Sequence, residues 1–307
     1  MNMSARDVRA SYPLPWFSVV CWNSCGLLTR SADIILYLHQ QQPSIFIIIE
    51  PLVTHISQQG FPKHHSYNTV SIKHPHDHRN GGFIIYMHKS ITYNQHNAQV
   101  PHFTSTTATT TALFHIASPS LPRPFILIPV YMSCNASQRD WDSFTSFLRL
   151  APTTFTHELP VLVMGDMNAH DSLWDLSIRV SDSDIGGRHL SSFLSHPDDW
   201  HLLNSNIQSS VSIPTHYPNR PGARPSVLDL AICNDYNLVE SFQVLQQDML
   251  SSDHQPIMCT LHSSGLNASS DTYQRYIWRT SRDDIPWDIF RSMLSLLLTS
   301  WHNTWSP

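Results

Sequence analysis

Short apolar runs alternate with polar stretches from the first part of the chain onward. The apolar run FSVVCW at 17–22 precedes a segment with apolar positions at helical spacing, 31–42, and then the β-branched run IFIII at 45–49. This order predicts a strand, a helix and a second strand. A crossover of this length usually makes the two strands parallel neighbours, so Asn23 and Glu50, each just past a strand, are expected at the same edge of one sheet.

The middle of the chain predicts antiparallel strands, a helix and a further buried strand. The β-rich runs lie at 82–87, 112–117 and 125–131, separated by polar or Pro-rich stretches that are typical of hairpin connections. Aromatic and aliphatic residues share one helical face of 138–150, and the run VLVMG that follows ends at Asp166. A carboxylate therefore stands at the end of another predicted strand.

The remaining periodic segments complete an α/β fold. A helix is expected after Gly186 and Gly187, and closing strands are expected at WHLLN, at 227–233 and at 256–261. We predict a four-layer α/β sandwich, with two mixed β-sheets packed face to face and helices outside. The predicted organisation is an N-terminal extension at 1–16, one domain at 17–261, a polar linker at 262–275 and a helical tail at 276–307.

Composition narrows the class of protein. The 307 residues have a formal net charge of -5 and only 13% charged residues, which excludes a basic nucleic-acid coat and a charged coiled coil. The longest apolar run is far below the ~18 residues that span a membrane, so we expect a soluble, unsecreted protein. The five cysteines are an odd number without CxxC pairs, and we interpret them as buried thiols of a reducing compartment.

Polar residues that terminate apolar strands are the candidates for chemistry. They include several carboxylates and an Asn oxygen without a convergent Cys, a set that favours Mg²⁺ or Mn²⁺ over zinc. A nearby His and Tyr indicate phosphate chemistry, in which a metal offsets charge and a His moves a proton. The candidates are Asn23, Glu50, Tyr131, Asp166, Asn168, Asp229, Asp253 and His254.

Two short segments carry most of this hypothesis. In an extended Gly165-Asp166-Met167-Asn168 segment, Asp166 and Asn168 point to the same side and can face one phosphate, although an ordinary Asp-x-Asn turn is the alternative. In Ser252-Asp253-His254, Asp253 can reach a metal and His254 a phosphate, with Asp229 as the acid that orients the imidazole. The alternative here is a loop histidine, one of 20 in the chain.

The other candidates have structural alternatives as well. Glu50 follows a run of Ile and Phe, where a carboxylate requires a compensating metal or donor unless it is simply solvated before Pro51. Taken alone, Asn23 and Tyr131 are better explained as hydrogen-bonded residues at the edge of the core, and only the combination with the other candidates favours a site.

These motifs, in this order, resemble the endonuclease/exonuclease/phosphatase superfamily. The similar segments are WNSCGL, IIIE, GGFIIYM, GDMNAH, VLDLAI and SSDHQPI, and they extend through 17–261. Longer segments, including GDMNAHDSLWD and IPTHYPNRPGARPSVLDLAI, resemble the apurinic-type endonuclease domain of non-LTR (LINE-like) retrotransposons. The tail is similar to the segment that joins such domains to a reverse transcriptase. Because no polymerase sequence follows, we expect a truncated or degenerate product of such an element, or a piece cut from one.

The resemblance implies a Mg²⁺-dependent (or Mn²⁺-dependent) DNA endonuclease that leaves a 3′-hydroxyl, as in target-primed retrotransposition. The implied metal ligands are Glu50, Asp253 and Asn23. Asp166 orients or deprotonates the attacking water, while His254, oriented by Asp229, stabilises charge or serves as the base; both assignments of the base are open. Asn168 and Tyr131 hold the phosphate. Thr215 and Ser226 are secondary substrate-binding candidates, with plain loop hydroxyls as the alternative.

Other functions remain open at this point. One is a different phosphoesterase of the same superfamily, acting at abasic sites or on RNA, lipid or inositol phosphates, and another is a non-catalytic relic of a retroelement. The expected partners are DNA and, in a full-length element, a reverse transcriptase. We expect a monomer that acts inside the cell, in the nucleus, without a membrane partner.

Overall fold

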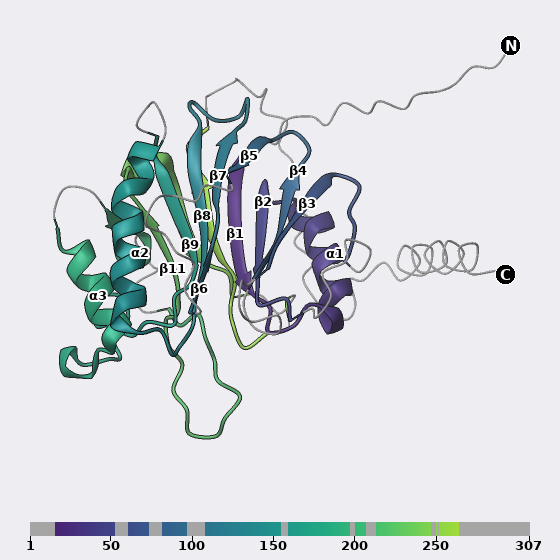
Figure 1. Cartoon of the computed structure of the whole chain (residues 1–307). Coiled ribbons are helices and arrows are strands. Elements are labelled where there is room, and N and C mark those ends of the chain that lie inside the picture. The colour runs from purple at the N-terminus through teal and green to yellow at the C-terminus, as the bar shows by residue number, and fades with distance from the viewer. Residues whose placement is uncertain are drawn as a thin grey trace, which may run out of the picture. The chain divides into compact units, whose positions relative to one another are not determined.

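Two β-sheets lie face to face, with helices on their outer faces (Figure 1). The computed structural model describes residues 16–52, 61–73, 82–96, 108–154, 159–196, 200–206, 213–246, 250 and 252–263. Helix α1 covers one sheet, and α2 and α3 cover the other (Figure 1). The predicted four-layer α/β sandwich is therefore confirmed.

The first sheet has the strand order β12-β13-β1-β2-β4-β3. Its strands are β1 (Phe17–Asn23), β2 (Ile45–Ile49), β3 (Tyr67–Ile72), β4 (Phe83–His88), β12 (Val239–Val244) and β13 (Ile257–Leu261). Only β1 and β2 pair in parallel among these neighbours. The crossover through α1 predicted this pairing, which is confirmed.

The second sheet has the order β10-β11-β9-β8-β7-β5, and β6 also pairs with β8. Its strands are β5 (Thr92–His96), β6 (Thr109–Thr111), β7 (Leu113–Ala117), β8 (Phe125–Met132), β9 (Val161–Asp166), β10 (His201–Leu202) and β11 (Asp229–Cys233). Its one parallel pair is β8 with β9, which are connected through α2. Each sheet is thus mixed and contains one parallel pair.

Local sequence explains where the helices begin. The α-helices are α1 (Ser31–Gln41), α2 (Gln138–Leu150), α3 (Ile185–Leu194) and the single turn α4 (Leu203–Asn206), with short 3₁₀ turns at Leu28–Arg30, Ala151–Thr154, Val180–Asp182 and Tyr236–Leu238. Ser137 and Asp140 form a capping box at the start of α2. The side chain of Asp184 caps α3 by accepting from the N–H of Gly187.

Strand β1 is mostly apolar because it is buried on both faces. Val19 and Cys21 point into the core between the sheets, whereas Val20 and Trp22 pack in the core under α1. Both faces of the strand are covered, so alternation with polar residues is lost. A third core lies between the second sheet and helices α2 and α3.

Several expectations required correction. Strands β3, β5 and β12 were not predicted, because polar side chains interrupt their apolar pattern and they lie at or next to the sheet edges. WHLLN forms only a two-residue strand followed by a helical turn. Cys134 is exposed and Cys25 is partly exposed, so the prediction of uniformly buried thiols was wrong for these two.

The boundaries of the predicted domains are only partly within the described residues. Strand β13 ends at Leu261, where the predicted domain ends. Nearly all of the extension at 1–16, most of the linker at 262–275 and the whole tail at 276–307 lie outside the described residues. In the described part of the chain, no helix is both long and apolar enough to cross a membrane.

The close approach of β8 and β9 yields a stability prediction at Gly165. A Cβ atom built there would lie 1.8 Å from the carbonyl oxygen of Val130 on β8. Because that neighbour is backbone, Gly165→Ala forces the two central strands apart, and we expect it to lower the free energy of unfolding by about 1–3 kcal/mol or more. Urea unfolding measures the change, with Val180→Ala as the control because Val180 is 79% exposed. Equal stability of the two variants would contradict the packing at this position.

Candidate active site

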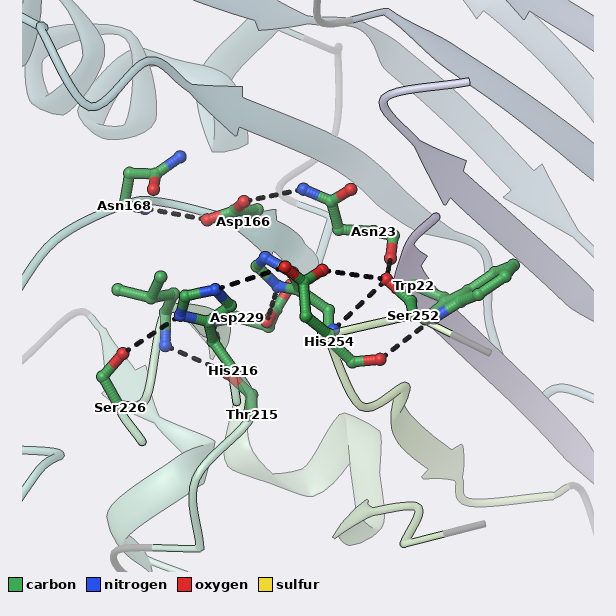
Figure 2. A network of polar contacts seen from close by, with 12 residues as sticks. Trp22, Asn23, Asp166, Asn168, Thr215, His216, Ser226, Asp229, Ser252 and His254 are labelled. Carbon is green, nitrogen blue, oxygen red and sulfur yellow. Dashed lines mark hydrogen bonds and ion pairs between the residues drawn. The ribbon is translucent and has the colours of Figure 1, made fainter. Parts of the chain in front are cut away.

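The side-chain amide of Asn23 joins carboxylates from both sheets. Asn23 is buried at the end of β1, and its Nδ2 donates to Oε2 of Glu50 and to Oδ2 of Asp166, each at 2.9 Å. Its Oδ1 accepts from the backbone N–H of Cys25 at 3.0 Å. Figure 2 shows Asn23 facing Asp166. Asn23, predicted as a metal ligand, is thus placed with its nitrogen toward the carboxylates and its oxygen engaged by the backbone.

Glu50 and Tyr131 lie beside this bridge. Glu50 follows β2 in a left-handed conformation, with φ of 49°, and its backbone carbonyl accepts from Gly26 and Ser24. Burial, the Glu50 charge and a hydrogen bond with Glu50 raise the pKa of the Tyr131 phenol well above its usual range. The structure therefore brings both predicted residues together, and the phenol remains protonated as a hydrogen-bond donor.

Asp166 and Asn168 form a tight turn after β9. Oδ1 of Asp166 accepts the backbone N–H of Asn168 at 3.0 Å, and Asn168 has φ of 45°. Nδ2 of Asn168 donates to the carbonyl of Met132 at 2.9 Å. Burial and the negative charge of Asp229 raise the pKa of Asp166 to about 7, against opposing effects of His254 and Asn23. The turn alternative from sequence is thus realised, with the Asp166 carboxylate held beside Asn23.

Asp229 and His254 form a buried pair. Asp229 starts β11 directly opposite Asp166, and its Oδ2 lies 2.8 Å from Nδ1 of His254 (Figure 2). Burial alone would lower the pKa of His254, but the charge and hydrogen bond of Asp229 raise it to about 9. Oδ1 of Asp229 is buried with no hydrogen-bond partner. The geometry matches the predicted orientation of His254 by Asp229.

Strand β1 positions the loop that carries His254. The indole nitrogen of Trp22 donates to the carbonyl of His254 at 3.1 Å. The hydroxyl of Ser252 donates to the carbonyl of Asn23 at 2.9 Å and accepts from the backbone N–H of His254 at 3.2 Å (Figure 2). Both ends of the Ser252–His254 segment are thereby fixed to β1.

Thr215 and Ser226 flank the proline-rich loop and make hydrogen bonds within the protein. Thr215 is fully buried, and its hydroxyl accepts the backbone N–H groups of Leu228 and Asp229, both at 3.0 Å. The Thr215 hydroxyl therefore holds the backbone at the start of β11 in place. A contact with substrate requires an accessible hydroxyl, and that of Thr215 is buried. The Ser226 hydroxyl lies 3.5 Å from Nδ1 of His216, at an isolated bridge between the two residues.

Cys25 and His216 are the residues that sequence reasoning missed. Sγ of Cys25 lies 3.2 Å from Oδ1 of Asp253, and Nε2 of His216 lies 3.8 Å from Oδ2 of the same carboxylate. Despite burial, the Cys25 hydrogen bond and the nearby histidines lower the pKa of Asp253. The expectation of a site without a convergent cysteine was therefore wrong. The position of Cys25 two residues after Asn23 was the available signal.

The site carries more negative than positive groups. Its carboxylates are those of Glu50, Asp166, Asp229 and Asp253. Among the described residues, the ion pairs of these carboxylates involve only His216 and His254. Oxygen ligands and uncompensated negative charge suit a hard divalent cation. Asp166, Asp229 and His254 also place one possible ligand atom each within 4.8 Å of one another.

Comparisons with known proteins agree with the motifs. Residues 125–258 match a family model described as endonuclease-reverse transcriptase. The chain is 23% identical over 256 residues to the RNA-directed DNA polymerase from the mobile element jockey of Drosophila funebris, covering 82% of this chain and 24% of that protein. The chain thus spans about a quarter of that relative's length.

Solved structures show the same fold. The endonuclease domain of TRAS1, a telomere-specific non-LTR retrotransposon, superposes with a TM-score of 0.59 at 17% identity, covering 80% of this chain and 98% of that domain. A Neisseria 3′ phosphatase bound to a product DNA hairpin superposes with a TM-score of 0.56 at 13% identity, covering 80% and 99%. The resemblance to the endonuclease/exonuclease/phosphatase superfamily and to non-LTR retrotransposon endonucleases is confirmed.

The hydrogen bonds that the Thr215 hydroxyl accepts can be tested by the effect of substitutions on the stability of the protein. Thr215→Val removes the oxygen that accepts two buried N–H groups, and we expect a loss of about 1–3 kcal/mol per unsatisfied group in the free energy of unfolding. Thr215→Ser retains the oxygen and is expected to keep most of the stability. Urea unfolding compares the two variants. Equal losses for Val and Ser would show that the hydroxyl does not carry this support.

Proposed function

We propose that this chain is a divalent-metal-dependent endonuclease that hydrolyses a DNA phosphodiester and leaves a 3′-hydroxyl. The observation that carries the proposal is the His254–Asp229 pair, joined at 2.8 Å and placed beside the Asp166 carboxylate that Asn23 links to Glu50. An oriented imidazole beside several carboxylates is suited to phosphoryl chemistry.

The residues present fit a hard divalent cation, with Mg²⁺ as the first choice and Mn²⁺ as the second. Glu50 and Asp253 supply accessible carboxylate oxygens, since both are only partly buried. Asn23 has its oxygen bound to a backbone N–H, and we assign it to holding Glu50 in place, with metal ligation through its remaining lone pair as a secondary role. When bound, the cation supplies charge neutralisation at the phosphoryl group and the leaving oxygen.

Side chains of the protein supply the other catalytic roles in this proposal. Asp166 orients the attacking water and accepts its proton. His254, with Nδ1 held by Asp229, directs Nε2 toward the phosphate and donates to the developing negative charge. Tyr131 and Asn168 hold non-bridging phosphate oxygens, and the single phenol proton of Tyr131, which is donated to Glu50 in the free protein, turns to the phosphate when DNA binds. Asp229 fixes the tautomer and supports the imidazolium.

DNA is the proposed substrate, in the context of a retroelement. The similarity to the jockey polymerase and to the retrotransposon endonuclease domain supports this assignment. Arg220 and Arg224 are exposed in the loop between His216 and Ser226, and His216 bridges to His254, so we assign the positive charge of this loop to DNA contact. In this proposal the protein acts in the nucleus as a monomer, with a reverse transcriptase as partner in the full-length element.

A phosphomonoesterase is the second candidate, because the similar Neisseria protein is described as a 3′ phosphatase. The same pair of His254 and Asp229 can serve either leaving group. The two functions differ in whether an internal phosphodiester is cut, so the substrate decides between them.

Nicking of supercoiled plasmid DNA tests the proposal directly. We expect Mg²⁺-dependent conversion to open circles that EDTA abolishes, with Asp166→Asn and His254→Gln each reducing the rate by about 10²–10⁴-fold. Extension of the nicked product by a DNA polymerase without phosphatase treatment checks for the 3′-hydroxyl. Exposed Asp182→Asn is the control variant. A folded protein that releases phosphate from a 3′-phosphorylated end but never nicks would establish the phosphatase instead.

The role of Asp229 can be separated from folding. Asp229→Asn keeps the side-chain shape but removes the charge that pairs with His254, and we expect a fall in kcat of at least about 10²-fold. Circular dichroism and thermal unfolding verify that the fold is retained. An unchanged kcat in a folded Asp229→Asn protein would exclude the proposed tautomer and charge control.

A further inference from the structure

Cys25 brings a thiol to an otherwise oxygen-rich site. Its φ of 44° is left-handed, and its Sγ lies 3.2 Å from Oδ1 of Asp253 and 3.5 Å from Oδ1 of Asn23. Cys21, Cys233 and Cys259 are buried in the core, whereas Cys25 is partly exposed. The thiol is thus the one sulfur among the described residues that reaches a carboxylate of this site.

Three different ligand types converge at this position. Cys25, Asp253 and His254 each offer one ligand atom, and these atoms all lie within 4.8 Å of one another. Because Nδ1 of His254 is bound to Asp229, Nε2 is the nitrogen left for a metal, in a carboxylate–histidine–metal arrangement. Nε2 of His216 lies 3.8 Å from Oδ2 of Asp253 and is a fourth potential ligand atom.

We propose that Cys25, Asp253 and His254 form a binding site for a thiophilic divalent cation, namely Zn²⁺, distinct in ligand chemistry from the site of the hard cation. Thiolate, imidazole and carboxylate are the ligands of zinc, whereas Mg²⁺ selects oxygen. Binding forms one Zn–S bond, and the thiol proton is released to solvent.

Zinc at this site has a regulatory consequence. It occupies Asp253 and the free nitrogen of His254, which the proposed hydrolysis requires. Micromolar zinc is therefore expected to inhibit the enzyme even in excess Mg²⁺. The binding itself does not depend on the proposed function, so it is tested without DNA.

Cobalt is the spectroscopic probe, because Co²⁺ replaces Zn²⁺ and a thiolate ligand gives an intense sulfur-to-cobalt absorption band. The metal-free, reduced full-length chain is titrated with Co²⁺ in the presence of millimolar Mg²⁺. We expect the band to saturate near one equivalent and to disappear when Zn²⁺ is added. We expect Cys25→Ser to lose it and to weaken Zn²⁺ affinity, measured by competition with a chromophoric chelator, by more than about 10-fold.

The matched control is Cys134→Ser, since Cys134 is exposed and does not belong to the group of three ligands. This variant is expected to keep the band, and His254→Gln is expected to alter the visible cobalt spectrum. Circular dichroism confirms folding of each protein. No band in the folded wild type, or a band that persists in Cys25→Ser, would overturn the proposal.

Discussion

One buried amide determines how the two sheets meet at the site. Nδ2 of Asn23 donates to Glu50, which follows a strand of the first sheet, and to Asp166, which ends a strand of the second. The negative charge of the partly buried Glu50 raises the pKa of the buried Asp166, and a shared donor stabilises both carboxylates. Because the amide oxygen is fixed by the N–H of Cys25, the nitrogen stays directed at the carboxylates. Tyr131 contacts one of the two linked carboxylates, Glu50, and Asp229 lies opposite the other, Asp166.

Strand direction explains why these groups converge. Each sheet contains one parallel pair, so Asn23 and Glu50 emerge at one edge of the first sheet, and Tyr131 pairs with Asp166 in the second. Strand β11 runs antiparallel to β9 and begins at Asp229, which therefore lies opposite Asp166. The sheets supply the rigid parts of the site, while the segment with Asp253 and His254 is fixed to β1 through Trp22 and Ser252.

The parts of this arrangement that follow from strand periodicity were predictable. Glu50 and Asp166 stand at the ends of apolar runs, and that pattern was enough to place them at the ends of strands. Asp229 lies inside the predicted run 227–233, and the structure begins β11 at this residue. Thr215 and Cys25 could not be placed in this way, because they lie in irregular segments whose path depends on tertiary hydrogen bonds. Strands β3 and β5 were missed for a related reason: an edge strand needs few apolar residues, so its sequence resembles a loop.

The pairing of β1 with β13 determines when, during synthesis of the chain, the site can be completed. Phe17 lies opposite Leu261, so one of the two neighbours of β1 is made long after β1 itself. Contacts of such large sequence separation form slowly, and an apolar strand is prone to aggregate until its partner strand has been made and has paired with it. The loop with Asp253 and His254 immediately precedes β13 and is made equally late. The proposed catalytic groups are therefore brought together only after β13 has been made and has paired with β1.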